Sequence, residues 1–152
     1  MALEIKVLQG SDAHVLRTVA DGVFDAPVDA SLGTEFIHDP RHHLCVATEN
    51  GVVVGFASAV HYVHPDKPNQ LWINEVGVAP DHQGKGVAKR ILSALLARGR
   101  DLGCTEAWVL TDEDNAAARA LYRAVGGTEA PQIMITFRLP DRGEPRPGTP
   151  LS

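Results

Sequence analysis

Cysteine, aromatic residues and long apolar runs are scarce in this chain, and each scarcity argues against a class of protein. Two cysteines, Cys45 and Cys104, are too few for a disulfide framework, so we expect reduced thiols in a cytoplasmic protein. No apolar run approaches the roughly 20 residues that cross a bilayer. The charged start around Glu4 and Lys6 is unlike a secretory signal. The sequence therefore predicts no membrane partner.

Basic residues are also in the minority, with 14 against 19 acidic residues and a net charge of -5. Proteins whose main partner is a nucleic acid carry basic patches, so this balance argues against nucleic acid. It allows a cationic substrate. Seven histidines are scattered along the chain, none at metal-site spacing from a cysteine or carboxylate, so we expect no metal.

The length and composition suit one domain. A chain of 152 residues with 44% hydrophobic content can bury its own core. We place this domain at residues 1–139. We predict a flexible tail at residues 140–152, which hold four prolines and two glycines. The oligomeric state stays open, with a homodimer among the alternatives.

Apolar periodicity and turn residues predict a mixed α/β sheet with helices on both faces. The expected strands span 5–8, 43–49, 52–61, 71–78, 107–110 (buried) and 132–138. Helices are expected after an N-cap at Ser11, within 23–42, from the turn 84–86 to a stop at Gly103, and over 115–125. Asn50-Gly51 predicts a tight hairpin, because both residues tolerate positive φ.

The most informative stretch is a glycine-bearing turn between the strand ending at Val78 and the long helix. Gly84 and Gly86 let the backbone bend and approach a ligand closely. The first turn of the helix offers unpaired N–H groups and the positive end of the dipole, which together bind phosphate. Lys85 would add a positive charge. The spacing fits neither a P-loop nor a dinucleotide fold, and an ordinary glycine-rich turn is the alternative.

This stretch resembles the first signature of the GNAT acetyltransferase superfamily: glutamine or arginine, two residues, glycine, one residue, glycine or alanine. Here it reads Gln83, Gly86 and Ala88. The second signature follows at the usual separation, as Asn115, Ala118, Leu121, Tyr122 and Gly126. The resemblance covers about residues 44–137. It implies a mostly antiparallel central sheet and an enzyme that moves acetyl from acetyl-CoA to a primary amine in a ternary complex.

The resemblance also implies a cofactor site. Backbone N–H groups along the turn would hold the CoA pyrophosphate, and these belong to Gln83, Gly84, Lys85, Gly86, Val87 and Ala88. The main chain of Val76 and Val78 would pair with the pantetheine arm like an added strand. The N–H of Val76 would also support the oxyanion.

Three further residues of the second signature complete the implied cofactor site. Asn115 would contact the pantetheine, together with Ala118, and Asn115 is equally suited to cap the helix. Tyr122 would protonate the departing thiolate. Packing of Tyr122 beside Leu121 as an ordinary buried aromatic residue is the alternative.

Glu75 is the candidate general base. It is the one carboxylate of an otherwise mostly apolar strand and directly precedes Val76. We expect the strand to bury it in part, which would suit it to proton transfer. Glu75 would then take the proton of the incoming ammonium group, directly or through water. A carboxylate at a strand end, paired with a histidine or lysine, is the alternative.

A closer resemblance concerns the acceptor amine. Residues 58–65, 73–78, 111–122 and 132–137 look like the antibiotic-resistance aminoglycoside 3-N-acetyltransferases, which carry an aspartate in the place of Glu75. In that reading Asp112, Glu113 and Asp114 would bind the polycationic drug. An exposed, solvated loop is the alternative for this triplet.

The chain also departs from those enzymes. Their paired aspartates and proline before the last helix are replaced here by Asn115-Ala116-Ala117. A protein, amino-acid or polyamine acceptor therefore stays open. So does a non-catalytic regulatory module that binds CoA without turnover, although the presence of Glu75 and Tyr122 speaks against it.

Overall fold

The structure is a computed structural model that describes residues 2–143. Its strands are β1 (Glu4–Val7), β2 (His42–Glu49), β3 (Val52–Tyr62), β4 (Gln70–Val78) and β5 (Glu106–Val109). Its α-helices are α1 (Ala30–His38), α2 (Val87–Asp101) and α3 (Ala116–Ala124), and two 3-10 helices span η1 (Gly10–Arg17) and η2 (Pro80–His82). Most of the predicted tail, residues 144–152, lies outside the described residues. None of the described helices has the length and apolar character needed to cross a membrane.

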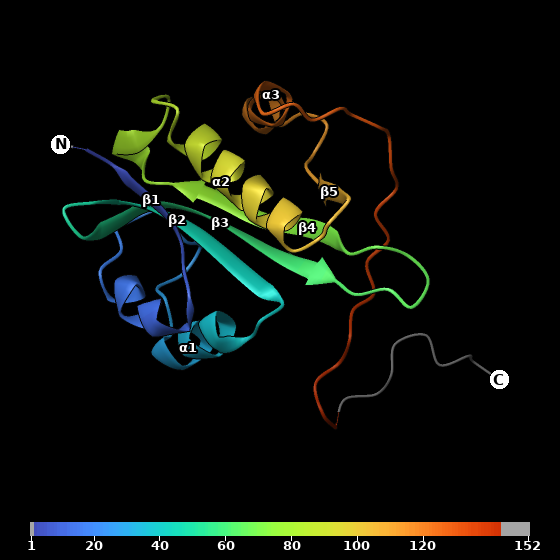
Figure 1. Cartoon of the computed structure of the whole chain (residues 1–152), viewed down its shortest axis with the longest axis horizontal. Helices are drawn as coiled ribbons and strands as arrows, with labels where there is room; N and C mark the ends of the chain where they lie inside the picture. The colour runs from blue at the N-terminus through green and yellow to red at the C-terminus, as the bar shows by residue number, and fades with distance from the viewer. Residues whose placement is uncertain (1, 144–152) are drawn as a thin grey trace.

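The strands form one sheet in the order β1-β2-β3-β4-β5. Neighbours are antiparallel except β4 and β5, which are parallel and joined through α2. Figure 1 shows α2 on one face of the sheet and α1 on the other. The expected mixed, mostly antiparallel sheet with helices on both faces is therefore confirmed.

The core lies between α2 and the sheet. Ile91, Leu92 and Leu95 recur at helical spacing and are fully buried, because α2 packs across β1 to β4. The central residues of β2 and β3 are buried on both faces of the sheet, and most of them are small or β-branched, among them Cys45, Val46, Ala47, Val53 and Ala57. The helix therefore approaches the sheet closely and fixes the position of its own first turn.

Local turn chemistry follows the sequence closely. Asn50 has φ 53° and Gly51 φ 77°, so the predicted hairpin between β2 and β3 is confirmed. Gly103 has φ 80° just after α2, where a helix stop was expected. The helix expected to follow an N-cap at Ser11 begins two residues earlier, at Gly10, and Ser11 is not its N-cap. Gln9 holds that position, and its backbone N–H donates to the Asp12 carboxylate at 2.8 Å.

Two expectations at the far edge of the sheet are wrong. β5 was expected to be buried, yet Glu106 and Ala107 are exposed. The reason is its place at the end of the sheet, with β4 as its one strand neighbour among residues 2–143. Residues 132–138 form no strand, since they lie beside no other strand and their side chains stand in solvent.

Candidate functional site

β4 loses one of its two neighbours halfway along its length. It pairs with β5 only from Gln70 to Ile73, and with β3 throughout. The register with β3 shifts at this point, since Ser58 faces Glu75 while Ala59 faces Ile73, so Asn74 is an extra residue. Beyond this bulge, the main chain of residues 75–78 has an open edge on the side that β5 has left. Val76 and Val78 lie in this stretch, and an extended ligand could pair with it.

The glycine turn follows directly. Gly84 and Gly86 have φ 73° and 77°, and Gly86 is the N-cap of α2. A Cβ atom at either glycine would meet nothing within 4 Å. These glycines are therefore needed for their positive φ and not for close packing, and the space beside the turn is open. The first backbone hydrogen bond of α2 runs from Arg90 N to Gly86 O at 3.2 Å. The N–H groups of Val87 and Ala88 therefore have no partner within the helix.

The charges around the turn are opposite in sign to the net charge of the chain. Lys85, Lys89 and Arg90 are all exposed at the beginning of α2. Gln83 connects the turn to the open strand, because its Nε2 donates to the carbonyl oxygen of Val78 at 3.0 Å. Free N–H groups, a helix dipole and three cations favour an anionic group such as a pyrophosphate.

The second signature forms α3. Asn115 caps this helix, with its Oδ1 accepting from Ala118 N at 3.1 Å, so the capping role is confirmed. Tyr122 is half-buried on α3 and packs against the core. Burial raises the pKa of Tyr122, and its hydroxyl group makes no hydrogen bond to the described residues. The phenol therefore stays protonated at neutral pH and is able to act as a proton donor.

Glu75 is more exposed than expected. Its side chain reaches solvent, so the predicted partial burial is wrong. The cause is the bulge at Asn74 and the end of β5, which leave this part of β4 without a neighbour on one side. Asp112, Glu113 and Asp114 are exposed as well and follow β5. Because β4 and β5 are parallel, Glu75 and these three residues emerge at the same end of the sheet.

The loop 19–28 borders this end of the sheet and carried no sequence signal. A Cβ atom on Gly22 would lie 3.0 Å from Pro80, and one on Gly77 would overlap the carbonyl oxygen of Val23. The loop therefore packs against β4 and the beginning of the turn. A cavity of about 380 Å³ lies within it, and Asp21 and Asp25 are among its lining residues.

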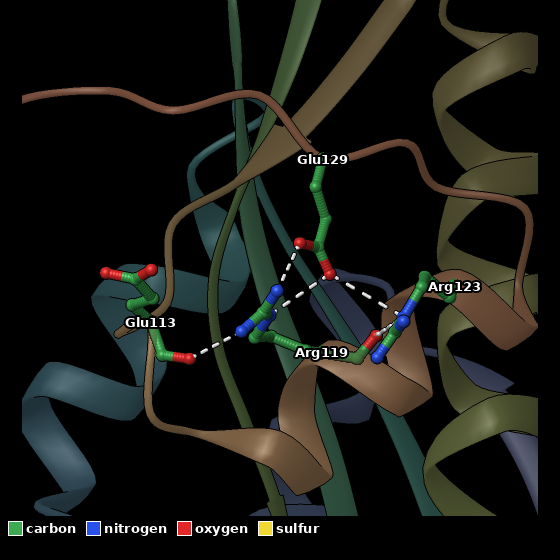
Figure 2. A network of polar contacts seen from close by, with 4 residues as sticks. All are labelled: Glu113, Arg119, Arg123 and Glu129. Carbon is green, nitrogen blue, oxygen red and sulfur yellow. Dashed lines mark hydrogen bonds and ion pairs between the residues drawn. The ribbon is translucent and has the colours of Figure 1, made fainter.

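A polar network connects the acidic loop to the segment that follows α3 (Figure 2). Arg119 forms a bidentate pair with Glu129, with Nε–Oε1 3.1 Å and Nη2–Oε2 2.7 Å. Its Nη1 also donates to the carbonyl oxygen of Glu113 at 2.7 Å. Arg123 approaches the same carboxylate at 3.6 Å. The network restrains residues 113 and 129 relative to α3.

Residues 14–126 match the Acetyltransferase (GNAT) family. The chain belongs to this family. The sequence-based resemblance is thereby confirmed at the level of the family.

Relatives of this GNAT chain differ in their names. It is 35% identical over 106 residues to N-alpha-acetyltransferase RimI of Mycobacterium tuberculosis, covering 68% of this chain and 63% of that protein. It is 33% identical over 98 residues to the L-amino acid N-acyltransferase MnaT of Escherichia coli, covering 64% of this chain and 54% of that protein. It is 37% identical over 91 residues to the mycothiol acetyltransferase of Pseudarthrobacter chlorophenolicus, covering 59% of this chain but 28% of that protein.

Solved structures share the fold at lower identity. An aminoglycoside acetyltransferase from an uncultured soil metagenomic sample, in complex with sisomicin, superposes with a TM-score of 0.77 at 17% identity, covering 90% of this chain and 95% of that one. The aminoglycoside acetyltransferase AAC(6')-Iy with a bisubstrate analogue has a TM-score of 0.75 at 21% identity, covering 91% and 99%. The predicted 3-N specificity is not confirmed, because this similar enzyme is named for the 6' position.

Proposed function

We propose that this GNAT protein transfers an acetyl group from acetyl-CoA to a primary amine by direct attack in a ternary complex. The observation that carries the proposal is the open edge of β4 running into the free N–H groups at the beginning of α2. The strand edge would hold the pantetheine arm, and Gln83 to Ala88 would hold the pyrophosphate. Open space in front of Gly84 and Gly86 supports this fit.

The acceptor would enter at the end of the sheet where Glu75 and the acidic loop emerge. Glu75, Asp112, Glu113 and Asp114 are exposed there. A cationic small molecule fits such a group of carboxylates, and an aminoglycoside is the candidate we put first, with 3-N acetylation as the hypothesis to test. This acceptor would make the protein a cytoplasmic antibiotic-resistance enzyme. The names of the relatives favour a second candidate, the amino group of an amino acid or of a protein N-terminus.

The chemistry needs three events at the thioester. Glu75 accepts the proton of the ammonium group, which frees the nitrogen lone pair for attack. The N–H of Val76 stabilises the negative charge that develops on the carbonyl oxygen. As the new C–N bond forms and the C–S bond breaks, Tyr122 would give its proton to the departing thiolate. The attacking nitrogen would then lose its second proton, which water would carry to the tyrosinate and so restore the phenol. The products are the acetylated amine and CoA with a free thiol.

Thiol release from acetyl-CoA tests the function directly. The panel holds an aminoglycoside, free amino acids, a polyamine and a peptide with a free N-terminus. We expect turnover with at least one amine. Binding of acetyl-CoA without release of thiol for any amine would refute the enzyme assignment and leave a regulatory CoA-binding module.

Two matched amide variants test the base. Glu75→Gln keeps the shape of the side chain and removes the basic group, so kcat/KM should fall by about 10²–10⁴-fold at neutral pH. The loss should shrink at high pH, where more free amine is already present. If Glu75→Gln keeps the wild-type pH profile while Asp114→Asn loses it, the base lies in the acidic loop instead.

A further inference from the structure

Three aromatic rings form a continuous row across one face of the sheet. Trp72 on β4 pairs directly with Trp108 on β5, and their ring centroids lie 5.0 Å apart with 14° between the planes. Tyr62 at the end of β3 extends the row, with its centroid 6.2 Å from that of Trp72 and 16° between the planes. These three residues are called the aromatic row below.

The aromatic row lies on the face of the sheet that α2 does not cover. A Cβ atom at Gly99 of α2 would lie 3.0 Å from Cδ2 of Leu71, so Leu71 points toward α2. Trp72 is the next residue of the strand and therefore points to the opposite face. The helix on that face, α1, packs mainly against η1 and β2, toward the β1 edge of the sheet (Figure 1). Tyr62 accordingly remains 37% exposed, and both indoles are exposed in part.

Glu75 shares this face with the aromatic row. It is the partner of Ser58 on β3, whereas Trp72 is the partner of Val60, two residues further along the same strand. Side chains at partner positions leave the same face of a sheet, and so do side chains two residues apart on one strand. Two residues of a strand span roughly 7 Å, so Trp72 and Glu75 are separated by about that distance on one face.

Ser58 adds a polar group beside Glu75. It is only 8% exposed, and its hydroxyl group makes no hydrogen bond to residues 2–143. A nearly buried hydroxyl group without a protein partner is available to a ligand on this face. The face therefore has a polar end, formed by Glu75 and Ser58, and an apolar end, formed by the aromatic row. Apolar walls with a few polar groups at one place are typical of sites for small molecules.

We propose that the aromatic row binds the non-reacting part of the acceptor, and that the acceptor is a primary amine with one aromatic ring and no carboxylate. The inference rests on the proposed function, because it places the reacting nitrogen at Glu75. The ring packs against the row, while the ammonium group meets Glu75 roughly 7 Å away. The carboxylates of Asp112, Glu113 and Asp114 at the same end of the sheet repel a free carboxylate. A polycation would place further charges over the apolar row, whereas a single ring leaves no polar group unpaired there.

Kinetics with amines of equal charge test the assignment. Phenylethylamine and butylamine each carry one ammonium group, and only the first has a ring. Thiol release should give a kcat/KM at least about tenfold higher for phenylethylamine, which is the scale of discrimination that an apolar pocket provides. The ratio should fall toward one in Trp108→Leu and persist in Trp108→Phe, because phenylalanine keeps a ring. Phe137→Leu removes an exposed ring outside the row and is the matched control. A wild-type ratio near one, or an equal fall in Phe137→Leu, would overturn the proposal.

Tryptophan fluorescence measures binding to the row without turnover and without a variant. Trp72 and Trp108 are the only tryptophans of the chain, so the whole signal comes from the row. With CoA present, phenylethylamine should change the emission in a saturable manner, and butylamine should not. Turnover of butylamine or of an aminoglycoside, with no emission change for phenylethylamine, would overturn this site and leave the proposed function intact. A saturable change without thiol release from acetyl-CoA would support the site and refute the function. Emission that responds to protein concentration instead of to phenylethylamine would assign the row to a contact between copies and overturn the proposal.

Discussion

Gly77 gives the sharpest test of how the acceptor end is assembled. It lies on the open part of β4, where the loop 19–28 packs against the strand. A Cβ atom there would overlap the carbonyl oxygen of Val23 and lie 2.7 Å from Cε1 of Phe56. The Phe56 ring is buried and stacks on Phe24 with centroids 4.0 Å apart. Neither neighbour can move away without displacing the loop.

The expected magnitude follows from those contacts. Overpacking of a core by one methyl group or more costs about 1–3 kcal/mol, and a backbone neighbour calls for the upper part of that range. Gly77→Ala should therefore lower the free energy of unfolding by about 2–3 kcal/mol. For a chain of this size the corresponding fall in Tm is roughly 4–12 °C. The displaced loop should also raise KM for the amine.

Gly99→Ala is the matched control. A Cβ atom at Gly99 would lie 3.0 Å from Cδ2 of Leu71, which is the end of a flexible side chain. Alanine also favours the interior of α2 by about 1 kcal/mol over glycine, so the two effects should nearly cancel. Urea unfolding of both variants, with steady-state kinetics, measures the difference. If Gly77→Ala unfolds within about 0.5 kcal/mol of the wild type and keeps its KM, the loop does not depend on Gly77.

Three further predictions concern the turn, the proton donor and a buried histidine pair. Gly86→Val should weaken CoA binding in calorimetry while the chain stays folded, because φ 77° disfavours a branched residue although the space around it is open; an unchanged affinity would remove the turn from the site. Tyr122→Phe should lower kcat by about tenfold with similar acetyl-CoA affinity, and an unaltered kcat under rate-limiting chemistry would refute the role of the hydroxyl group. Nε2 of the buried His43 lies 2.7 Å from Nδ1 of His61. Burial is the larger cause and the charge of His61 the next, and together they lower the pKa of His43 from 6.5 to about 4. Unfolding therefore takes up a proton between these values, so stability falls as pH is lowered through this window, by about 2 kcal/mol between pH 7 and pH 5. His43→Gln should show a smaller loss in urea unfolding at the two pH values, and an equal loss would assign the acid sensitivity elsewhere.

Features that depend on neighbouring residues in sequence could be predicted well. The hairpin at Asn50-Gly51 follows from positive φ at two adjacent residues, and α2 follows from its apolar spacing and the glycines at both ends. The turn of the site belongs to this group, because a strand, two glycines and a helix lie within a few residues. The cap at Asn115 is equally local, since its partner is three residues away.

Features that depend on distant partners could not be predicted. The exposure of Glu75 is set by where β5 ends, which no residue near Glu75 encodes. The alternation over 132–138 predicts a strand, but a strand forms only beside another, and no strand among residues 2–143 pairs with this segment. The loop 19–28 has no motif. Its position becomes visible only through the contact of Val23 with Gly77.

Direct transfer requires a proton acceptor for the amine and a proton donor for the thiolate at one thioester. The surroundings of Glu75 suit the first role, and those of Tyr122 suit the second. Tyr122 is half-buried, and burial raises its pKa, so the hydroxyl group keeps its proton until the thiolate needs it. Glu75 reaches solvent on the open part of β4, so a hydrated ammonium group can reach its carboxylate. The bound acceptor would then cover the carboxylate and displace the water around it. Proton transfer would therefore follow acceptor binding and precede attack, which agrees with a ternary complex.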